Sequence, residues 1–194
     1  MKYVNFKSGI AALGMLIVSV NGMAQSATVT FSGTVKTTTC SLTVAGPASA
    51  GTTTATTTTV SSSSGTASIF LPSIAPSQLT GAVGTTAGTT AIALGVSGCA
   101  VSSGLTPTIY LSSSVASGGY IPTGLSGISF QLLDSTSSAI TLTTSPTYNA
   151  SLTALGTGTS ASLTYYIRYI ATAATVTAVG SSSAATMTVT LYYV

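Results

Sequence analysis

One stretch near the end of the sequence decides the fold: residues 185–194, Ala185-Thr186-Met187-Thr188-Val189-Thr190-Leu191-Tyr192-Tyr193-Val194. Apolar or aromatic residues occupy its odd-numbered positions, and Thr occupies the first three even-numbered ones. Because successive side chains of a β-strand point to opposite faces, this alternation gives one apolar face and one hydroxylated face. The stretch therefore predicts a strand that packs Met187, Val189, Leu191 and Tyr193 against a core.

Similar signals recur along the chain. Segments rich in β-branched and aromatic residues favour strands, and they cover residues 28–36, 89–96, 108–111, 128–133, 140–142 and 163–170. Clusters of Gly, Ser, Thr and Pro between them are typical of turns. We interpret the Thr/Ser tract 51–65 as a surface loop and residues 71–76, with two prolines, as an extended connector. Short strands separated by turn clusters predict an all-β sandwich.

The N-terminus has the pattern of a secretory signal peptide. Lys2 and Lys7 supply positive charge, an apolar run of 11 residues follows from Ile10 to Val20, and small residues precede the expected cleavage after Ala24. Cleavage after Ala27 is the alternative. The apolar run is too short for a membrane-spanning helix, which needs about 20 residues. We expect residues 1–24 to be removed on export.

The sequence contains two cysteines, Cys40 and Cys99. Export would place them in an oxidising compartment, where disulfides persist, so we expect one bridge between them. Closing a loop of about 60 residues would stabilise the fold by about 4 kcal/mol through loop-closure entropy. Two free buried thiols are the alternative.

The composition argues against an enzyme. The chain has no His and a single acidic residue, Asp134. General acid–base catalysis needs a group positioned to exchange protons near neutral pH, and a Ser-His-Asp triad needs a His. A zinc site needs four ligands, which two Cys and one Asp do not supply. We therefore expect no catalytic residues, no metal, no cofactor and no small-molecule substrate.

The charges argue against nucleic-acid binding. The formal net charge is +3, but two of the four cations lie in the expected signal peptide. The remaining charges are Lys36, Arg168 and Asp134, a net of +1, whereas a nucleic-acid binder neutralises several phosphates. Only 3% of residues are charged, against roughly 25% in ordinary domains. Such a chain lacks the charge repulsion that keeps copies of a protein apart, which favours a protein that functions in an assembly.

Five motifs follow one another over residues 25–194. They are Thr28-Val29-Thr30-Phe31-Ser32-Gly33-Thr34-Val35 followed by Cys40, an apolar strand before Cys99, Gly127-Ile128-Ser129-Phe130-Gln131-Leu132-Leu133-Asp134, Tyr166-Ile167-Arg168-Tyr169-Ile170-Ala171-Thr172, and the penultimate aromatic Tyr193 with Gly180 upstream. Together, in this order, they resemble the type 1 fimbrial major-subunit family of chaperone–usher pili.

The resemblance implies an all-β fold, an incomplete immunoglobulin-like β-sandwich that lacks its final strand and is completed by a donor strand from a neighbouring subunit. It divides the chain into a signal peptide (1–24), a donor-strand extension (25–38) and a pilin domain (39–194). In the donor, Val29, Phe31 and Val35 would fill pockets, with Gly33 where only bare backbone fits. The acceptor groove and chaperone-binding strand would comprise Met187, Val189, Leu191, Tyr193 and Val194.

The function that the resemblance implies is that of a structural subunit, polymerising by donor-strand exchange into a surface fibre that supports adhesion. Its partners would be neighbouring subunits, a periplasmic chaperone that grips the carboxylate of Val194, and an outer-membrane usher. The protein would be exported through the periplasm to a fimbrium on the bacterial cell surface. The alternatives are a minor adaptor or tip adhesin subunit, or an outer-membrane β-barrel.

Two points remain open at the level of sequence. Residues 29–35 also fit an ordinary first strand within the chain's own fold. Asp134 and Arg168 are expected to be structural, and a contact between the two is one possibility.

Overall fold

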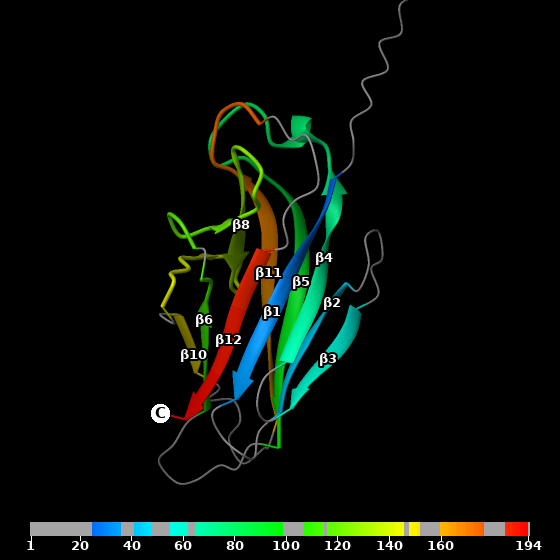
Figure 1. The fold of residues 1–194 in the computed structure, drawn as a ribbon, viewed down its shortest axis with the longest axis vertical. Coiled ribbons are helices and arrows are strands. Elements are labelled where there is room, and N and C mark those ends of the chain that lie inside the picture. Colours follow the sequence, from blue (N-terminus) through cyan, green and yellow to red (C-terminus); the bar gives the residue numbers. More distant parts are fainter. Residues whose placement is uncertain are drawn as a thin grey trace, which may run out of the picture.

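The computed structural model describes residues 25–35, 41–47, 55–61, 65–98, 107–114, 116–145, 148–151, 160–176 and 185–193. These residues form two β-sheets packed face to face, with one short 3-10 helix, η1 (Pro76–Gln78), at one end (Figure 1). The predicted all-β, immunoglobulin-like sandwich is therefore confirmed. The expected signal peptide, Cys40, Cys99 and Val194 lie outside the described residues.

Sheet A contains five strands in the order β10-β6-β12-β1-β4 within the described part of the chain. Their bounds are β10 (Tyr148–Ser151), β6 (Pro107–Ser112), β12 (Ala185–Tyr193), β1 (Gln25–Val35) and β4 (Gly65–Ile74). In Figure 1 this sheet faces the viewer, with β1 between β12 and β4.

Sheet B has the order β3-β2-β5-β11-β8-β7, and β9 pairs with β8 beside this path. Its strands are β3 (Ala55–Ser61), β2 (Ser41–Pro47), β5 (Thr86–Ser97), β11 (Ala161–Ala171), β8 (Ile128–Leu133), β7 (Ile121–Pro122) and β9 (Ala139–Ile140). The strand β11 lies near its centre, paired with β5 and β8.

The core lies between the sheets because alternate residues of their strands are apolar and buried. Sheet A contributes Val29, Ile69, Leu71, Ile109, Leu111, Met187 and Val189, and sheet B contributes Leu42, Val44, Ile92, Leu94, Phe130, Leu132, Tyr165, Ile167 and Tyr169. The rings of Phe130 and Tyr169, opposite each other on β8 and β11, have centroids 5.2 Å apart at an interplanar angle of 51°. Such tilted aromatic pairs add stability beyond the area they bury.

Six of the strands predicted from the sequence are confirmed, with small changes of bounds: β1, β5, β6, β8, β11 and β12. The strand predicted at 140–142 is observed as β9 and ends at Ile140, although Leu142 is also buried. The strand β2 and the short strands β7 and β10 were not predicted, nor was β4.

The interpretation of residues 51–65 as a loop was wrong for residues 55–61 and for Gly65, which begins β4, while residues 51–54 and 62–64 lie outside the described residues. Residues 55–61 form β3, which pairs antiparallel with β2 from Ala55–Pro47 to Ser61–Ser41. Thr is β-branched and fits a strand that lies at the edge of a sheet, even where apolar residues are scarce. The abundance of Thr was therefore a strand signal that the low apolar content obscured.

The interpretation of residues 71–76 as a connector was wrong for its first four residues. The strand β4 continues to Ile74, paired with β1. Its ladder shifts register between Ala27–Leu71 and Gln25–Ile74, and the exposed Pro72 falls inside this irregular step. Because β4 is the outer strand of sheet A, a proline without an N–H group is tolerated there.

Within the described residues, no helix reaches the length and hydropathy that crossing a membrane requires.

Candidate functional site: the seam between the first and last strands

The most unusual junction in the molecule joins the two strands that are farthest apart in sequence. The strand β1 pairs in parallel with β12, from Val29–Ala185 to Val35–Leu191, and in Figure 1 both arrows point to the same end of the sandwich. All the other pairings between described strands are antiparallel. No hairpin connects β1 with β12, so their pairing depends on tertiary packing.

On its other side, β1 pairs antiparallel with β4, including Val29–Ile69, Phe31–Ala67 and Gly33–Gly65. The main chain of β1 is thus hydrogen-bonded from both flanks, like that of an interior strand. We call this arrangement of β12, β1 and β4 the seam.

Val29 anchors the seam in the core. Its side chain is fully buried, and its partners on either side, Ala185 and Ile69, are also buried. Burying a side chain of this size contributes roughly 1.5–3 kcal/mol. The row Ile69–Val29–Ala185 therefore joins the three strands of the seam on their core side.

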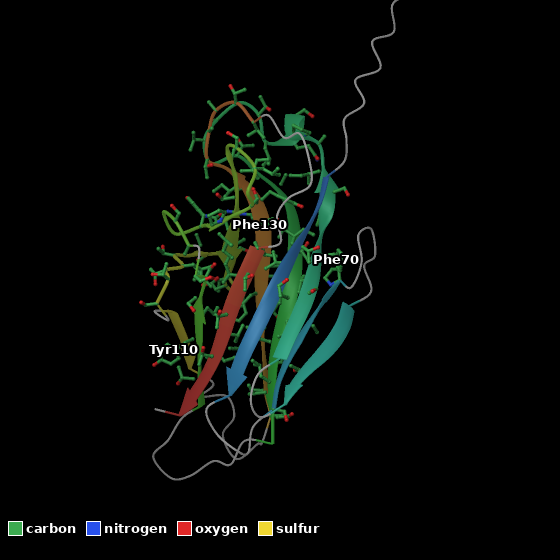
Figure 2. All side chains as sticks on the ribbon, viewed as in Figure 1. Phe70, Tyr110 and Phe130 are labelled. Carbon is green, nitrogen blue, oxygen red and sulfur yellow. The ribbon has the colours of Figure 1, made fainter. Side chains whose placement is uncertain are left out.

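The flanks of the seam are attached to the rest of the sandwich independently of β1. On one side, β12 pairs with β6, and beyond that ladder the hydroxyl of Ser113 donates a 2.7 Å hydrogen bond to the carbonyl oxygen of Thr186. On the other side, Ile69 of β4 packs over Gly46 of β2, where a Cβ atom would lie 2.5 Å from Ile69 Cδ1. Figure 2 labels Tyr110 on β6 and Phe70 on β4, the strands on either side of the β12–β1 pair.

The structure brings the predicted donor and acceptor residues together. Val29 of the donor set and Met187 and Val189 of the acceptor set are buried in one core cluster. The backbone register places Phe31 beside Met187, Gly33 beside Val189 and Val35 beside Leu191. Tyr193 lies at the end of β12, paired with Pro107 of β6. The place that we predicted for a neighbour's strand is occupied here by the chain's own β1.

One flank of the seam was missed from the sequence. Residues Ala67, Ile69 and Leu71 of β4 alternate with Ser68, Phe70 and Pro72. This period-2 pattern was present, but the Thr/Ser tract before it and the prolines after it hid the strand.

Asp134 and Arg168 make separate contacts. Oδ1 of Asp134 accepts hydrogen bonds from the Thr136 hydroxyl (2.7 Å), the Thr136 N–H (2.8 Å) and the Ser138 N–H (2.9 Å), which shape the β8–β9 turn. These bonds, the one from the Thr136 hydroxyl foremost, lower the pKa of Asp134 below its ordinary value. Arg168 Nε donates a 2.9 Å hydrogen bond to Oε1 of Gln131, directly opposite on β8. Both residues therefore stabilise local structure.

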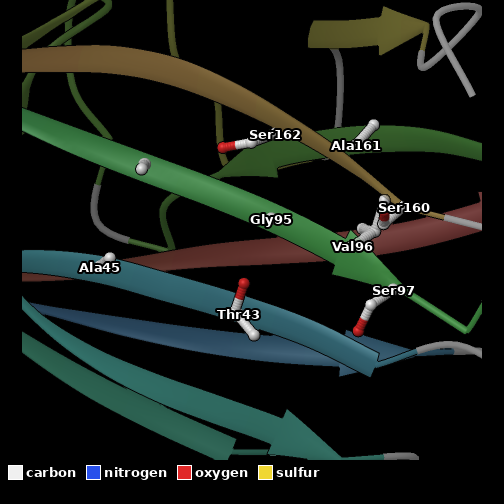
Figure 3. Close-up of a pocket in the computed structure, with 9 residues that line it drawn as sticks. Thr43, Ala45, Gly95, Val96, Ser97, Ser160, Ala161 and Ser162 are labelled. Carbon is white, nitrogen blue, oxygen red and sulfur yellow. The ribbon is translucent and has the colours of Figure 1, made fainter.

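Apart from the seam, sheet B carries an open depression of about 610 Å³, shown in Figure 3. It is lined by Thr43, Ala45, Ala93, Gly95, Val96, Ser97, Ser160, Ala161 and Ser162. These side chains are small, and none carries a charge. Among the described residues, no group of three or more His, Cys, Asp or Glu side chains is placed to hold a metal ion.

Comparison with known proteins gives a limited result. No protein-family model matches the chain. No curated protein matches it. Among solved structures, it is similar to the crystal structure of an antigen and type I fimbria protein of Burkholderia pseudomallei, with 20% sequence identity and a TM-score of 0.42 over 86% of this chain and 94% of that one.

Proposed function

We propose that the chain is a structural subunit of a chaperone–usher fimbria, in which copies join by exchanging β1. The observation that carries this proposal is the position of β1. It fills a gap between β12 and β4, with Val29 fully buried, although it belongs to the N-terminal part of the chain. A strand that no hairpin joins to its parallel partner can be supplied by another copy, as in domain swapping.

Removing β1 would create a site suited to another strand. The inner edges of β12 and β4 would lose their main-chain partners, and buried apolar side chains of both, including Met187, Val189 and Ile69, would face an open groove. Such edges recruit a strand or aggregate. In strand addition, main-chain hydrogen bonds supply affinity and alternate side chains supply specificity.

The sequence supports the same role. Three features of the sequence fit an exported structural subunit of an assembly: the expected signal peptide, the single expected disulfide and the scarcity of charged groups. On this proposal the chain has no catalytic activity, a periplasmic chaperone first occupies the groove, an outer-membrane usher receives the subunit, and the fibre supports adhesion at the bacterial surface.

The proposal is tested by deleting residues 25–38 and expressing the chain together with its chaperone. We expect a folded, chaperone-bound subunit that adds to no fibre as a donor, because its groove is intact and its donor segment is gone. Normal homopolymeric fibres from this variant, seen by electron microscopy, would disprove the donor assignment.

A subtler variant tests the fit of the donor. Gly33 pairs with Val189 on one side and Gly65 on the other. We expect Gly33→Leu to slow polymerisation while chaperone binding is unchanged. Ser32→Leu, one position along and on the opposite face by strand alternation, is the matched control. Equal polymerisation rates for the two variants would contradict a close fit at Gly33.

A further inference from the structure

The outer edges of the two sheets differ in how well they are protected against pairing with other strands. Exposed edges present free N–H and C=O groups, and proteins protect them with short strands, prolines, bulges or charges. Among the described strands, β10 has four residues, and β7 and β9 have two each. The strand β4 is longer, but it carries Pro72 within an irregular step. Each of these edges therefore has at least one protective feature.

The edge at β3 has none of these features. It is seven residues long, and its ladder with β2 is regular from one end to the other. Its sequence, Ala55-Thr56-Thr57-Thr58-Thr59-Val60-Ser61, contains no Pro, no Gly and no charged residue. In the described part of the chain β3 pairs with β2 alone. It is the type of edge to which another strand adds readily.

We infer that β3 pairs antiparallel with the β3 strand of a second copy of this chain, joining the two B sheets side by side. An antiparallel pair related by a two-fold axis uses the same surface on both partners. With the axis at Thr58, Thr57 of each copy lies opposite Thr59 of the other, and Thr58 lies opposite itself. Thr–Thr pairs are among the stabilising cross-strand pairs.

Charge also favours a second copy as the partner. A like-charged edge would repel itself, but β3 is neutral, and the described chain carries only Arg168 and Asp134 as charged side chains. Both belong to the part of sheet B around β8 and β11, with β2 and β5 between them and β3. Nothing electrostatic on the described surface therefore opposes contact between two copies at this edge.

This contact differs from the joint in the proposed function. The exchanged strand β1 lies between β12 and β4 in sheet A, whereas β3 is the outer strand of sheet B. A copy can therefore exchange β1 and pair through β3 at the same time. For copies already in fibres, the β3 contact would link one fibre laterally to the next.

The test uses the whole folded chain. By the register with β2, positions 57 and 59 share a face with Ala45 and Thr43, the outer face of sheet B. Lysines introduced there would lie opposite each other in the pair without being buried. We expect sedimentation equilibrium to show dimers of the parent chain, and the double variant Thr57→Lys/Thr59→Lys to dissociate at least about tenfold more readily, because like charges oppose cross-strand pairing.

The matched control is Thr89→Lys/Thr164→Lys, which adds the same charge at exposed positions of the interior strands β5 and β11. It should dimerise like the parent. Hydrogen exchange measured by mass spectrometry should show protection of residues 55–61 that rises with protein concentration. A parent chain that stays monomeric, equal weakening by both double variants, or protection that appears at β1, β4 or β10 instead of β3 would overturn the inference. Protection at β1 would overturn the β3 contact but would still agree with exchange of β1 between copies, so the two proposals fail separately.

Discussion

The strands β1 and β11 occupy equivalent positions in the two sheets, but they are attached to the protein in different ways. Each pairs with a strand on both sides and contributes to the same core, β1 through Val29 and β11 through Tyr165, Ile167 and Tyr169. Both neighbours of β11 are antiparallel, and its end is fixed by main-chain hydrogen bonds from Ala171 to Thr85 and from Thr172 to Gly127. The strand β1 has one parallel neighbour, β12, and no hairpin joins the two.

The difference shows that a strand can be buried in a sheet and still be replaceable by the same strand of another copy. Side-chain contacts to β8, the Arg168–Gln131 hydrogen bond and the Tyr169–Phe130 ring pair, add to the ladders that hold β11. Because β11 lies within the chain, it cannot leave without unfolding sheet B. On our proposal β1 can leave, and a second copy can replace it.

The largest expected effect separates the two strands by rescue. Val29 of β1 and Ile167 of β11 are both fully buried. Replacing either by Asp buries an unpaired charge, which should lower the free energy of unfolding by more than about 4 kcal/mol. A synthetic peptide of residues 25–35 should restore the thermal transition of Val29→Asp, because it replaces the defective strand, and should leave Ile167→Asp unfolded. Rescue of neither variant would remove the distinction between the strands.

The next effect concerns the anchoring of the seam to sheet B. Gly88 of β5 has φ +64°, and a Cβ atom there would lie 2.8 Å from Tyr169 Cδ2 and 2.9 Å from Ile74 Cγ2. Gly88→Ala should therefore lower stability by roughly 2–4 kcal/mol, through backbone strain and overpacking where β4 ends against β11. Gly84→Ala, at φ +91° with open space around it, should cost only the strain, roughly 1–2 kcal/mol. Urea unfolding measures both, and equal losses would contradict the packing argument.

These contacts show what the sequence could and could not reveal. Alternation and β-branched content predicted β1, β12 and β11 because each has one face in the core. The Thr-rich β3 and the Pro72-bearing part of β4 were missed because edge strands tolerate polar residues and proline. The strands β7 and β9 have two residues each and are defined by pairing with β8. The parallel register of β1 with β12 has no local signal, because no turn joins them.

A smaller effect is expected in the β8–β9 turn, which holds β8 beside β11. Ser137 has φ +66°, the only positive φ at a non-glycine residue in the described chain. Ser137→Gly should relieve left-handed strain and raise the free energy of unfolding by about 0.5–1 kcal/mol, after the entropy that glycine loses on folding. Ser135→Gly, the same substitution in the same turn, should lower it, since no such strain is relieved there. A loss of stability in both variants would argue against strain at Ser137.

The smallest effect is pH dependence from Asp134. Its pKa in the folded state lies below the ordinary 3.8, chiefly because its carboxylate accepts hydrogen bonds from Thr136 and Ser138. The stabilisation it gives is therefore present above about pH 4 and is lost as the pH falls through the folded-state pKa. Since Asp134 is the only acidic side chain, Asp134→Asn should flatten the pH dependence of urea unfolding between about pH 5 and pH 2. An unchanged pH profile would show that these hydrogen bonds do not favour the carboxylate.

If β1 of one copy completes sheet A of another, the β12 amides of the accepting copy are protected only while a functional donor strand is bound. Chain lacking residues 25–38 is released from its chaperone in the presence of intact chain, and exchange of residues 185–193 in the shortened copy is followed by mass spectrometry. We expect these amides to exchange slowly with intact chain present and rapidly when the intact chain carries Val29→Asp. Equal exchange rates with the two partners, whether slow or rapid, would contradict strand exchange through β1.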